Sequence, residues 1–369
     1  MSDPPESYPH LAITSALCID GDVLDRLGRV LRYLVVGLVE QAVSVQLVSD
    51  DPRVMSLRLG PTKTVLHHPV AWPMAKSRLR QLAEQLTVDP PVLIHALSGG
   101  SYRVAAALAD ALDVELVLQV TSLHDCEAIA QMDESRIGAI IALSQPLVTA
   151  LETQLQIAPE KLHLVRPGVM TDEHLACFAD EQREPTILCT SAFERDRGVD
   201  RLIEAVDLLR QRGCNAMTFL LGQGRYESAL RRMVRHRRLT AQVTFSNLVG
   251  GLLETLQSCD ILVRPSSRAS ITADPLLAMA RGVAVVSLPN AICDHFQHEQ
   301  TAYICSKPTA ESLADALERL ITDIEYARRI ATSAREYIRQ NHAISTMAER
   351  ICDVYRELAL SRATFPIRE

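Results

Sequence analysis

Residues 265–272, which are rich in serine, have the types and spacing best suited to ligand binding. Short apolar runs at 260–264 and 283–287 predict buried strands, and the apolar residues at 275–280 predict a short helix that ends at Gly282. Strand, loop, helix and strand in this order form a βαβ unit, in which free N–H groups at the helix start can bind a phosphate. We therefore expect an anion site that includes Ser267, Arg268, Ser270 and Thr272.

The same stretch resembles the donor-binding segment of family-4 glycosyltransferases, P-S-x-x-E-G-F-G followed by E-A-M-A-x-G-x-P-V-V. The matching residues are Pro265, Ser266, Ala278, Met279, Ala280, Gly282, Val285 and Val286. In the family, the first glutamate contacts the transferred sugar and the second holds the ribose hydroxyls of the nucleotide. Ala269 and Leu277 stand at these two positions, so the frame is kept and both carboxylates are lost.

Other parts of the second half extend this resemblance. Residues 191–198 are similar to a G-R-L, three residues, K-G pattern whose arginine and lysine clamp the donor diphosphate. Ala192 replaces the arginine, whereas Arg197 keeps the charge of the lysine. Gly222 and Gly224 match a G-x-G turn, and Asn247 replaces a glycine in the loop that packs on the nucleotide base. The resemblance implies that Arg197, Gly222, Gly224 and Asn247 bind the donor.

Two segments of the first half resemble the acceptor side of the same family. Gly21 matches one residue of a Gly-Gly loop that lies close to the donor phosphates. Residues 20–22 also spell D-x-D, a metal-binding signature of a different fold, but a helix cap and turn is the favoured interpretation. Residues 121–125 resemble a T-x-H-D segment, in which His124 hydrogen-bonds a sugar hydroxyl or shares developing charge. The alternative is a histidine that bonds its own loop backbone.

The two missing carboxylates put catalysis in question. Each charged hydrogen bond contributes about 1.5–3 kcal/mol, so losing two would weaken donor binding on the order of a hundred- to ten-thousand-fold. Asp274, one helical turn before Leu277, is the nearby acid that could compensate. The alternative is an acid that only favours the helix N-terminus. Arg264 and Arg268 are candidate replacements for the arginine that Ala192 has displaced.

Composition excludes several classes of protein. The 369 residues carry a net charge of −7, and no nucleic-acid-reading motif is present, so we expect no nucleic-acid partner. The nine cysteines form no C-x-x-C pair or zinc spacing, and we expect neither a metal nor a tightly bound cofactor. The polar N-terminus and the absence of a long apolar run predict a cytoplasmic protein. Six arginines within 225–238 leave peripheral membrane contact open.

Near-continuous apolar strands that alternate with amphipathic helices predict an α/β protein with parallel sheets. Together with the resemblance, this pattern predicts two Rossmann-like doubly wound domains that face each other across a cleft, the GT-B arrangement. We place the first domain at 1–180, the second at 181–345, and a final helix at 346–369 that crosses back to the first. Residues 54–70 fit a hairpin or an irregular loop.

The resemblance implies a retaining glycosyltransferase, which moves a sugar from a nucleotide-diphosphate sugar to an unknown acceptor: a glycan, a glycolipid or a small molecule. A second hypothesis is a non-catalytic homologue, a binding or scaffolding subunit that pairs with an active glycosyltransferase or retains an acceptor only. A homo-oligomer is a further partner expectation. A third, an epimerase on the same architecture, is disfavoured because no pair of acids stands at corresponding strand ends.

Overall fold

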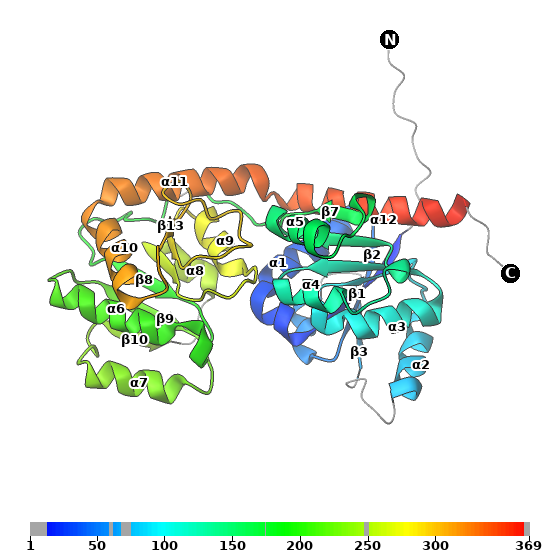
Figure 1. Cartoon of the computed structure of the whole chain (residues 1–369), viewed down its shortest axis with the longest axis horizontal. Coiled ribbons are helices and arrows are strands. Elements are labelled where there is room, and N and C mark those ends of the chain that lie inside the picture. The colour runs from blue at the N-terminus through cyan, green and yellow to red at the C-terminus, as the bar shows by residue number, and fades with distance from the viewer. Residues whose placement is uncertain (1–12, 59–61, 68–74, 174, 247–250, 365–369) are drawn as a thin grey trace, which may run out of the picture. The chain divides into compact units, whose positions relative to one another are not determined.

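The computed structural model describes residues 13–58, 62–67, 75–173, 175–246 and 251–364 (Figure 1). The chain divides into two compact units. The first comprises residues 1–168 together with 344–369, and the second comprises residues 169–343. Both are α/β units built on parallel sheets, as the sequence predicted.

The first unit contains a seven-stranded parallel sheet in the order β3-β2-β1-β4-β5-β6-β7. Its strands are β1 (Thr14–Ile19), β2 (Ser44–Ser49), β3 (Lys63–Leu66), β4 (Leu93–Ala96), β5 (Glu115–Val120), β6 (Ala139–Ala142) and β7 (Leu162–Leu164). Its helices are α1 (Gly21–Glu40), α2 (Ala75–Leu86), α3 (Tyr102–Leu112), α4 (Leu123–Ile129), α5 (Gln145–Gln154) and α12 (Ile344–Thr364). Strand β3 pairs in parallel with β2, so the hairpin interpretation of 54–70 is wrong.

Helix α12 joins the first unit by packing against α1. A Cβ atom on Gly37 of α1 would lie 2.7 Å from the Cβ of Ala348, so the glycine permits this close approach. Farther along α12, the Tyr355 hydroxyl lies 2.7 Å from Nδ1 of His95 on β4. Both side chains are fully buried, and the pair ties the last helix to the centre of the sheet.

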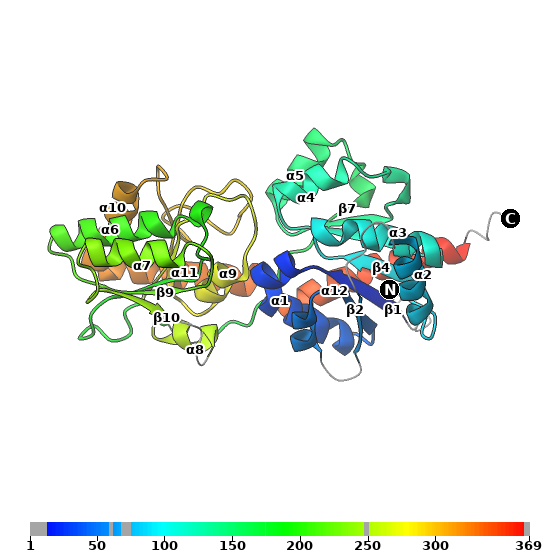
Figure 2. The same cartoon turned by 90° about the horizontal axis from the view of Figure 1, so that it is seen from below.

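The second unit contains a six-stranded parallel sheet in the order β10-β9-β8-β11-β12-β13. Its strands are β8 (Thr186–Cys189), β9 (Met217–Leu221), β10 (Val243–Ser246), β11 (Ile261–Arg264), β12 (Ala284–Ser287) and β13 (Tyr303–Ile304). Its helices are α6 (Val199–Gln211), α7 (Glu227–His236), α8 (Leu252–Gln257), α9 (Ala273–Ala280), α10 (Ala310–Thr322) and α11 (Ile324–Asn341). Helices α6 and α7 pack side by side, and α9 packs against α11 (Figure 2).

The division between the units lies at Gly168–Val169, earlier than the boundary expected at residue 180. The backbone of the intervening segment bonds the end of α9: Asp172 N–H donates to Ala280 O at 3.1 Å, and Cys177 N–H donates to Gly282 O at 2.9 Å. These bonds attach residues 169–180 to the second unit. Within the described ranges, no helix is both long enough and apolar enough to cross a membrane.

Candidate functional site

The strand order of the second unit reverses between β8 and β11, and ligands of doubly wound sheets bind where such a reversal opens the carboxyl edge. The loops that follow these two strands, residues 190–198 and 265–272, meet there. Gly198 has a φ of +73°, and a Cβ atom on it would lie 2.1 Å from the carbonyl oxygen of Pro265. Only glycine allows this conformation together with so close a backbone contact.

Two arginine side chains lie at this reversal without a carboxylate partner among the described residues. The Nε atom of Arg197 is buried and has no hydrogen-bond partner there. Arg264, at the end of β11, is buried and donates from Nη1 to Ser266 O at 2.9 Å and from Nη2 to Arg268 O at 2.9 Å. Burial lowers the pKa of Arg264, and the nearby charge of Arg197 lowers it further. The arrangement concentrates positive charge that an anion would stabilise.

The remaining residues expected in the anion loop have different environments. Arg268 is exposed, and its Nε atom lies 2.9 Å from Oδ2 of Asp196, so its charge is paired. Ser267 is exposed, whereas Ser270 accepts a hydrogen bond at its carbonyl from Arg264. Thr272 holds the N-cap position of α9 without a side-chain capping bond. Of the two candidate replacements, the Arg264 side chain therefore lies beneath the loop, whereas the Arg268 side chain extends from the loop to Asp196.

Gly222 and Gly224 pack against the loop that follows β8. Cβ atoms on them would lie 2.4 Å from Ser191 O and 2.2 Å from Phe193 O. The Phe193 N–H donates to Gln223 O at 2.9 Å. The glycines thus let two loops of the site lie against each other. Asn247, the other residue expected near the nucleotide base, lies outside the described residues.

The positions of the missing carboxylates contain no substitute acid. Leu277 is fully buried in α9, and Ala269 is half-buried in the loop. Asp274 lies in the first turn of α9 and is half-buried. Burial is the main cause that raises the pKa of the Cys189 thiol at the end of β8, and the charge of Asp274 adds to it. Asp274 is therefore within electrostatic range of the same strand reversal.

In the first unit the strand order reverses between β1 and β4. Asp20 lies at the end of β1, directly before Gly21, and caps α1 by accepting the Val23 N–H at 2.9 Å. It also accepts a hydrogen bond from the Ser98 hydroxyl after β4. Asp22 pairs with Arg26 at 2.7 Å. These contacts make residues 20–22 a helix cap and turn.

A buried carboxylate that the sequence analysis missed, Asp125, organises the next loops of this edge. Asp125 is 3% exposed and accepts the Gly99 N–H at 3.0 Å, the Thr121 N–H at 2.7 Å and the Thr121 hydroxyl at 2.7 Å. A Cβ atom on Gly99 would lie 2.8 Å from Oδ1 of Asp125, and one on Gly100 would lie 2.7 Å from Oδ2 of Asp20. The Gly-Gly pair at residues 99–100, shortly after strand β4, was the available sequence signal.

His124, the expected sugar contact, points away from this network. Its side chain is 86% exposed, and Nδ1 lies 3.3 Å from Oε2 of Glu127. In the part of the chain that the structure describes, it makes no hydrogen bond to its loop backbone. No group of three or more His, Cys, Asp or Glu side chains in that part is placed to hold a metal ion.

Comparison with known proteins relates this architecture to sugar transfer. Residues 172–337 match the family described as "Glycosyl transferases group 1". The uncharacterized glycosyltransferase YqgM of Bacillus subtilis is 24% identical over 207 residues, which cover 55% of this chain and 57% of that protein. The GDP-mannose-dependent alpha-(1-6)-phosphatidylinositol monomannoside mannosyltransferase of Mycobacterium tuberculosis is 24% identical over 216 residues, which cover 53% of this chain and 56% of that protein.

These alignments span little more than half the length of the curated relatives. Among solved structures, Anabaena Alr3699/HepE in complex with UDP and glucose superposes with a TM-score of 0.78 at 15% identity. The superposition covers 94% of this chain and 100% of that one. The chain therefore has the two-unit fold of GT-B glycosyltransferases.

Proposed function

We propose that the protein binds a nucleotide-diphosphate sugar at the β8–β11 reversal and transfers its sugar, with retention, to an acceptor that is a glycan, a glycolipid or a small molecule. The observation that carries this proposal is the pair Arg197 and Arg264, which have no carboxylate partner in the described ranges. The match of residues 172–337 to a glycosyltransferase family supports it.

In this proposal each group has a defined task. Arg197 contacts the diphosphate directly, and the buried charge of Arg264 acts on it from beneath the 265–272 loop. Both stabilise the negative charge that develops on the departing diphosphate. Asp274 takes the place of the missing ribose carboxylate. Because arginines supply the positive charge, no metal ion is required.

Calorimetric titration with uridine, guanosine, adenosine and thymidine diphosphate sugars tests donor binding. A panel is needed because one relative is named as GDP-mannose-dependent and one similar structure holds UDP. We expect micromolar affinity for one donor, unchanged by a chelator. Arg197→Ala should weaken that affinity about ten- to a hundredfold through the lost charged hydrogen bond.

Arg195→Ala is the matched control, because Arg195 is a neighbouring exposed cation whose guanidinium lies 5.7 Å from the centre of the Tyr226 ring. Its donor affinity should equal that of the unmodified protein. Equal affinities of the Arg197 and Arg195 variants would remove Arg197 from the site. Transfer is tested separately, by release of nucleoside diphosphate when candidate acceptors are added to the bound donor.

A second candidate function is a non-catalytic homologue that acts as a partner subunit or as a homo-oligomer. The observation that favours it is Leu277, fully buried where the family has the ribose carboxylate. Failure to bind every donor of the panel would support this function over transfer. Sedimentation of the purified chain would then test self-association.

A further inference from the structure

Helix α7 exposes arginines along one face. It buries Leu230 and Val234 in the second unit, whereas Arg231, Arg232 and Arg235 are exposed. Arg225 before the helix and Arg238 after it extend this row, and we refer to these five residues as the α7 arginine face. Residues 225–238 contain six arginines and one glutamate, in a chain of net charge −7. Positive charge is therefore concentrated on this helix.

Most of this charge has no partner within the unit. Arg231 pairs with Glu227 at 2.8 Å and lies over the Phe245 ring at 4.4 Å. The side chains of the other four arginines of the face make no hydrogen bond, ion pair or ring contact with any described residue: Arg225, Arg232, Arg235 and Arg238. On an ordinary solvated helix face, acids lie one turn from the bases and pair with them. Here the one acid of residues 225–238, Glu227, already pairs with Arg231.

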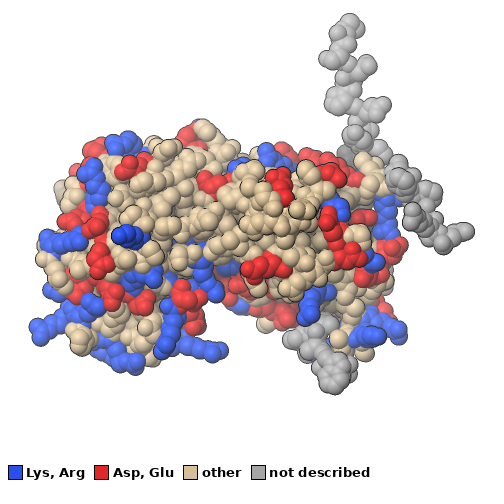
Figure 3. Space-filling view, viewed as in Figure 1, with Lys and Arg blue, Asp and Glu red and all other residues tan. Residues whose placement is uncertain are grey.

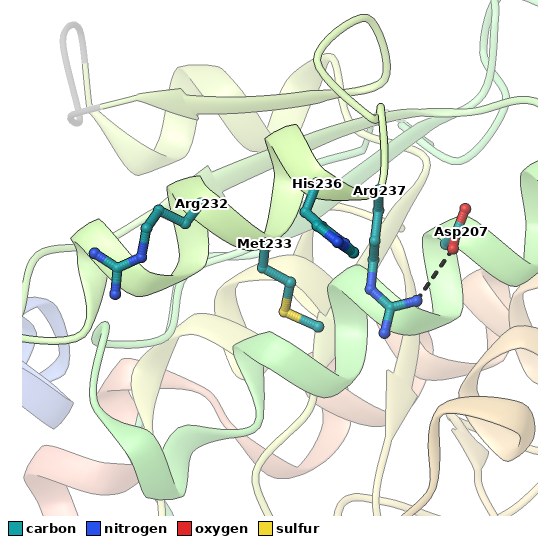
Figure 4. A pocket seen from close by; sticks show the side chains of 5 residues that line it. All are labelled: Asp207, Arg232, Met233, His236 and Arg237. Carbon is teal, nitrogen blue, oxygen red and sulfur yellow. Dashed lines mark hydrogen bonds and ion pairs between the residues drawn. The ribbon is translucent and has the colours of Figure 1, made fainter.

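A recess lies beside the face, between α6 and α7 (Figure 4). It has a volume of about 560 Å³ and is lined by Asp207, Arg232, Met233, His236 and Arg237. Arg237 lies beside Asp207 at 3.1 Å, and Arg232 extends away on the other side of Met233 (Figure 4). In the space-filling view, Lys and Arg side chains gather and project over α7 (Figure 3).

The character of the face favours a lipid headgroup surface over other anions. Among the described residues, the exposed large apolar side chains all lie elsewhere, so α7 has none to insert into a bilayer core. Binding to single-stranded nucleic acid commonly uses free aromatic faces for base stacking, but Arg231 lies over Phe245 and Arg195 lies over Tyr226. Guanidinium groups bind phosphodiester oxygens in a bidentate manner, and a row of them along one helix face can meet many headgroups at once.

We propose that the α7 arginine face docks the protein on an anionic phospholipid bilayer. Attachment occurs at headgroup depth and is electrostatic, and the recess between α6 and α7 admits one phosphorylated headgroup beside Arg232. Each arginine close to an anionic surface contributes about a fivefold increase in affinity. This inference rests on α7 and the recess beside it, and does not depend on the proposed donor site.

Vesicle co-sedimentation of the purified full chain tests the proposal. Vesicles of phosphatidylcholine are compared with vesicles of phosphatidylcholine and phosphatidylglycerol in equal parts. We expect binding to the second kind only, and its loss at about 1 M salt, where the screening length falls to about 3 Å. The combined variant Arg232→Gln, Arg235→Gln and Arg238→Gln should bind on the order of a hundredfold more weakly.

The matched control is Arg32→Gln, Arg80→Gln and Arg103→Gln, which removes three exposed arginines from the first unit. It has the same net charge, and it should bind vesicles like the unmodified protein. Equal loss in both variants would show a general charge effect and overturn the proposal. So would binding to pure phosphatidylcholine, displacement by millimolar glycerol phosphate, or binding to a DNA duplex without vesicle binding.

Discussion

The two units repeat one topology, but the charged groups at their strand reversals have different partners. In the first unit, Asp20 and Asp125 accept hydrogen bonds from the backbone and hydroxyl groups of their own loops and of the loop after β4. In the second, Arg197 has no partner and Arg264 has only carbonyl oxygens, within the described residues.

This difference distinguishes charged groups that stabilise the fold from charged groups that can bind a ligand. A carboxylate that receives several N–H groups is fully satisfied in the folded chain, so it stabilises its loops without a ligand. A guanidinium with a buried, unbonded nitrogen carries a desolvation cost that an incoming phosphate can offset. We therefore expect substitutions in the first unit to change stability, and substitutions of Arg197 to change binding.

The largest expected effect in the first unit is that of Asp125→Ala. It leaves the buried Thr121 N–H and the half-buried Gly99 N–H without an acceptor, so the free energy of unfolding should fall by about 3–5 kcal/mol. Chemical denaturation measures this change. The exposed Glu127→Ala variant is the control and should stay within about 0.5 kcal/mol. A stable Asp125→Ala protein with altered ligand binding would reverse the assignment of Asp125 to structure.

Glycine substitutions compare the rigidity of the two reversals. Gly198→Ala combines a φ of +73° with a contact of 2.1 Å to a backbone oxygen, and should cost about 3 kcal/mol of stability. Gly100→Ala meets the end of the Asp20 side chain at 2.7 Å, which can shift, and should cost about 1 kcal/mol. Thermal unfolding measures the stability that each variant loses. Equal losses in the two variants would contradict the expectation that the second reversal is the more rigid one.

A pH-dependent effect also belongs to the first unit. Burial lowers the pKa of His95 from 6.5 to about 3. The folded protein keeps this histidine neutral while the unfolded chain binds a proton, so its contribution is fully present above pH 6.5 and is lost as the pH falls toward 3. The free energy of unfolding should decrease by at most about 1.4 kcal/mol per pH unit in this window.

Two variants isolate that slope. His95→Gln should remove it, whatever its effect on absolute stability. Tyr355→Phe should keep the slope and lower stability by about 1 kcal/mol, because it removes the hydroxyl that hydrogen-bonds Nδ1 of His95. Denaturation at a series of pH values gives both quantities, and an unchanged slope in His95→Gln would assign the acid sensitivity to another group.

Much of the fold and part of the site could be predicted from the sequence, because the signals are local. Alternating buried strands and amphipathic helices determined the parallel α/β class, and the spacing around residues 265–282 determined the βαβ unit with its loop. The sequence predicted a helix cap and turn within residues 20–22, since a cap depends on residues only a few positions away, and the structure places the cap at Asp20. The strand β3 and helix α2 were missed, although Leu82, Ala83 and Leu86 of α2 recur at helical spacing.

Only the tertiary structure decided what each polar side chain does. His124 and Asp125 are neighbours in the sequence, yet about 100° of rotation per helical residue turns one to solvent and the other inward. Arg264 and Arg268 also differ in their surroundings: the Arg264 side chain lies beneath the loop, whereas Arg268 pairs with Asp196. Hydrogen bonds over long separations, such as Cys177 to Gly282, placed residues 169–180 in the second unit. Local spacing determines the elements, whereas burial and partners depend on residues that are distant in the chain.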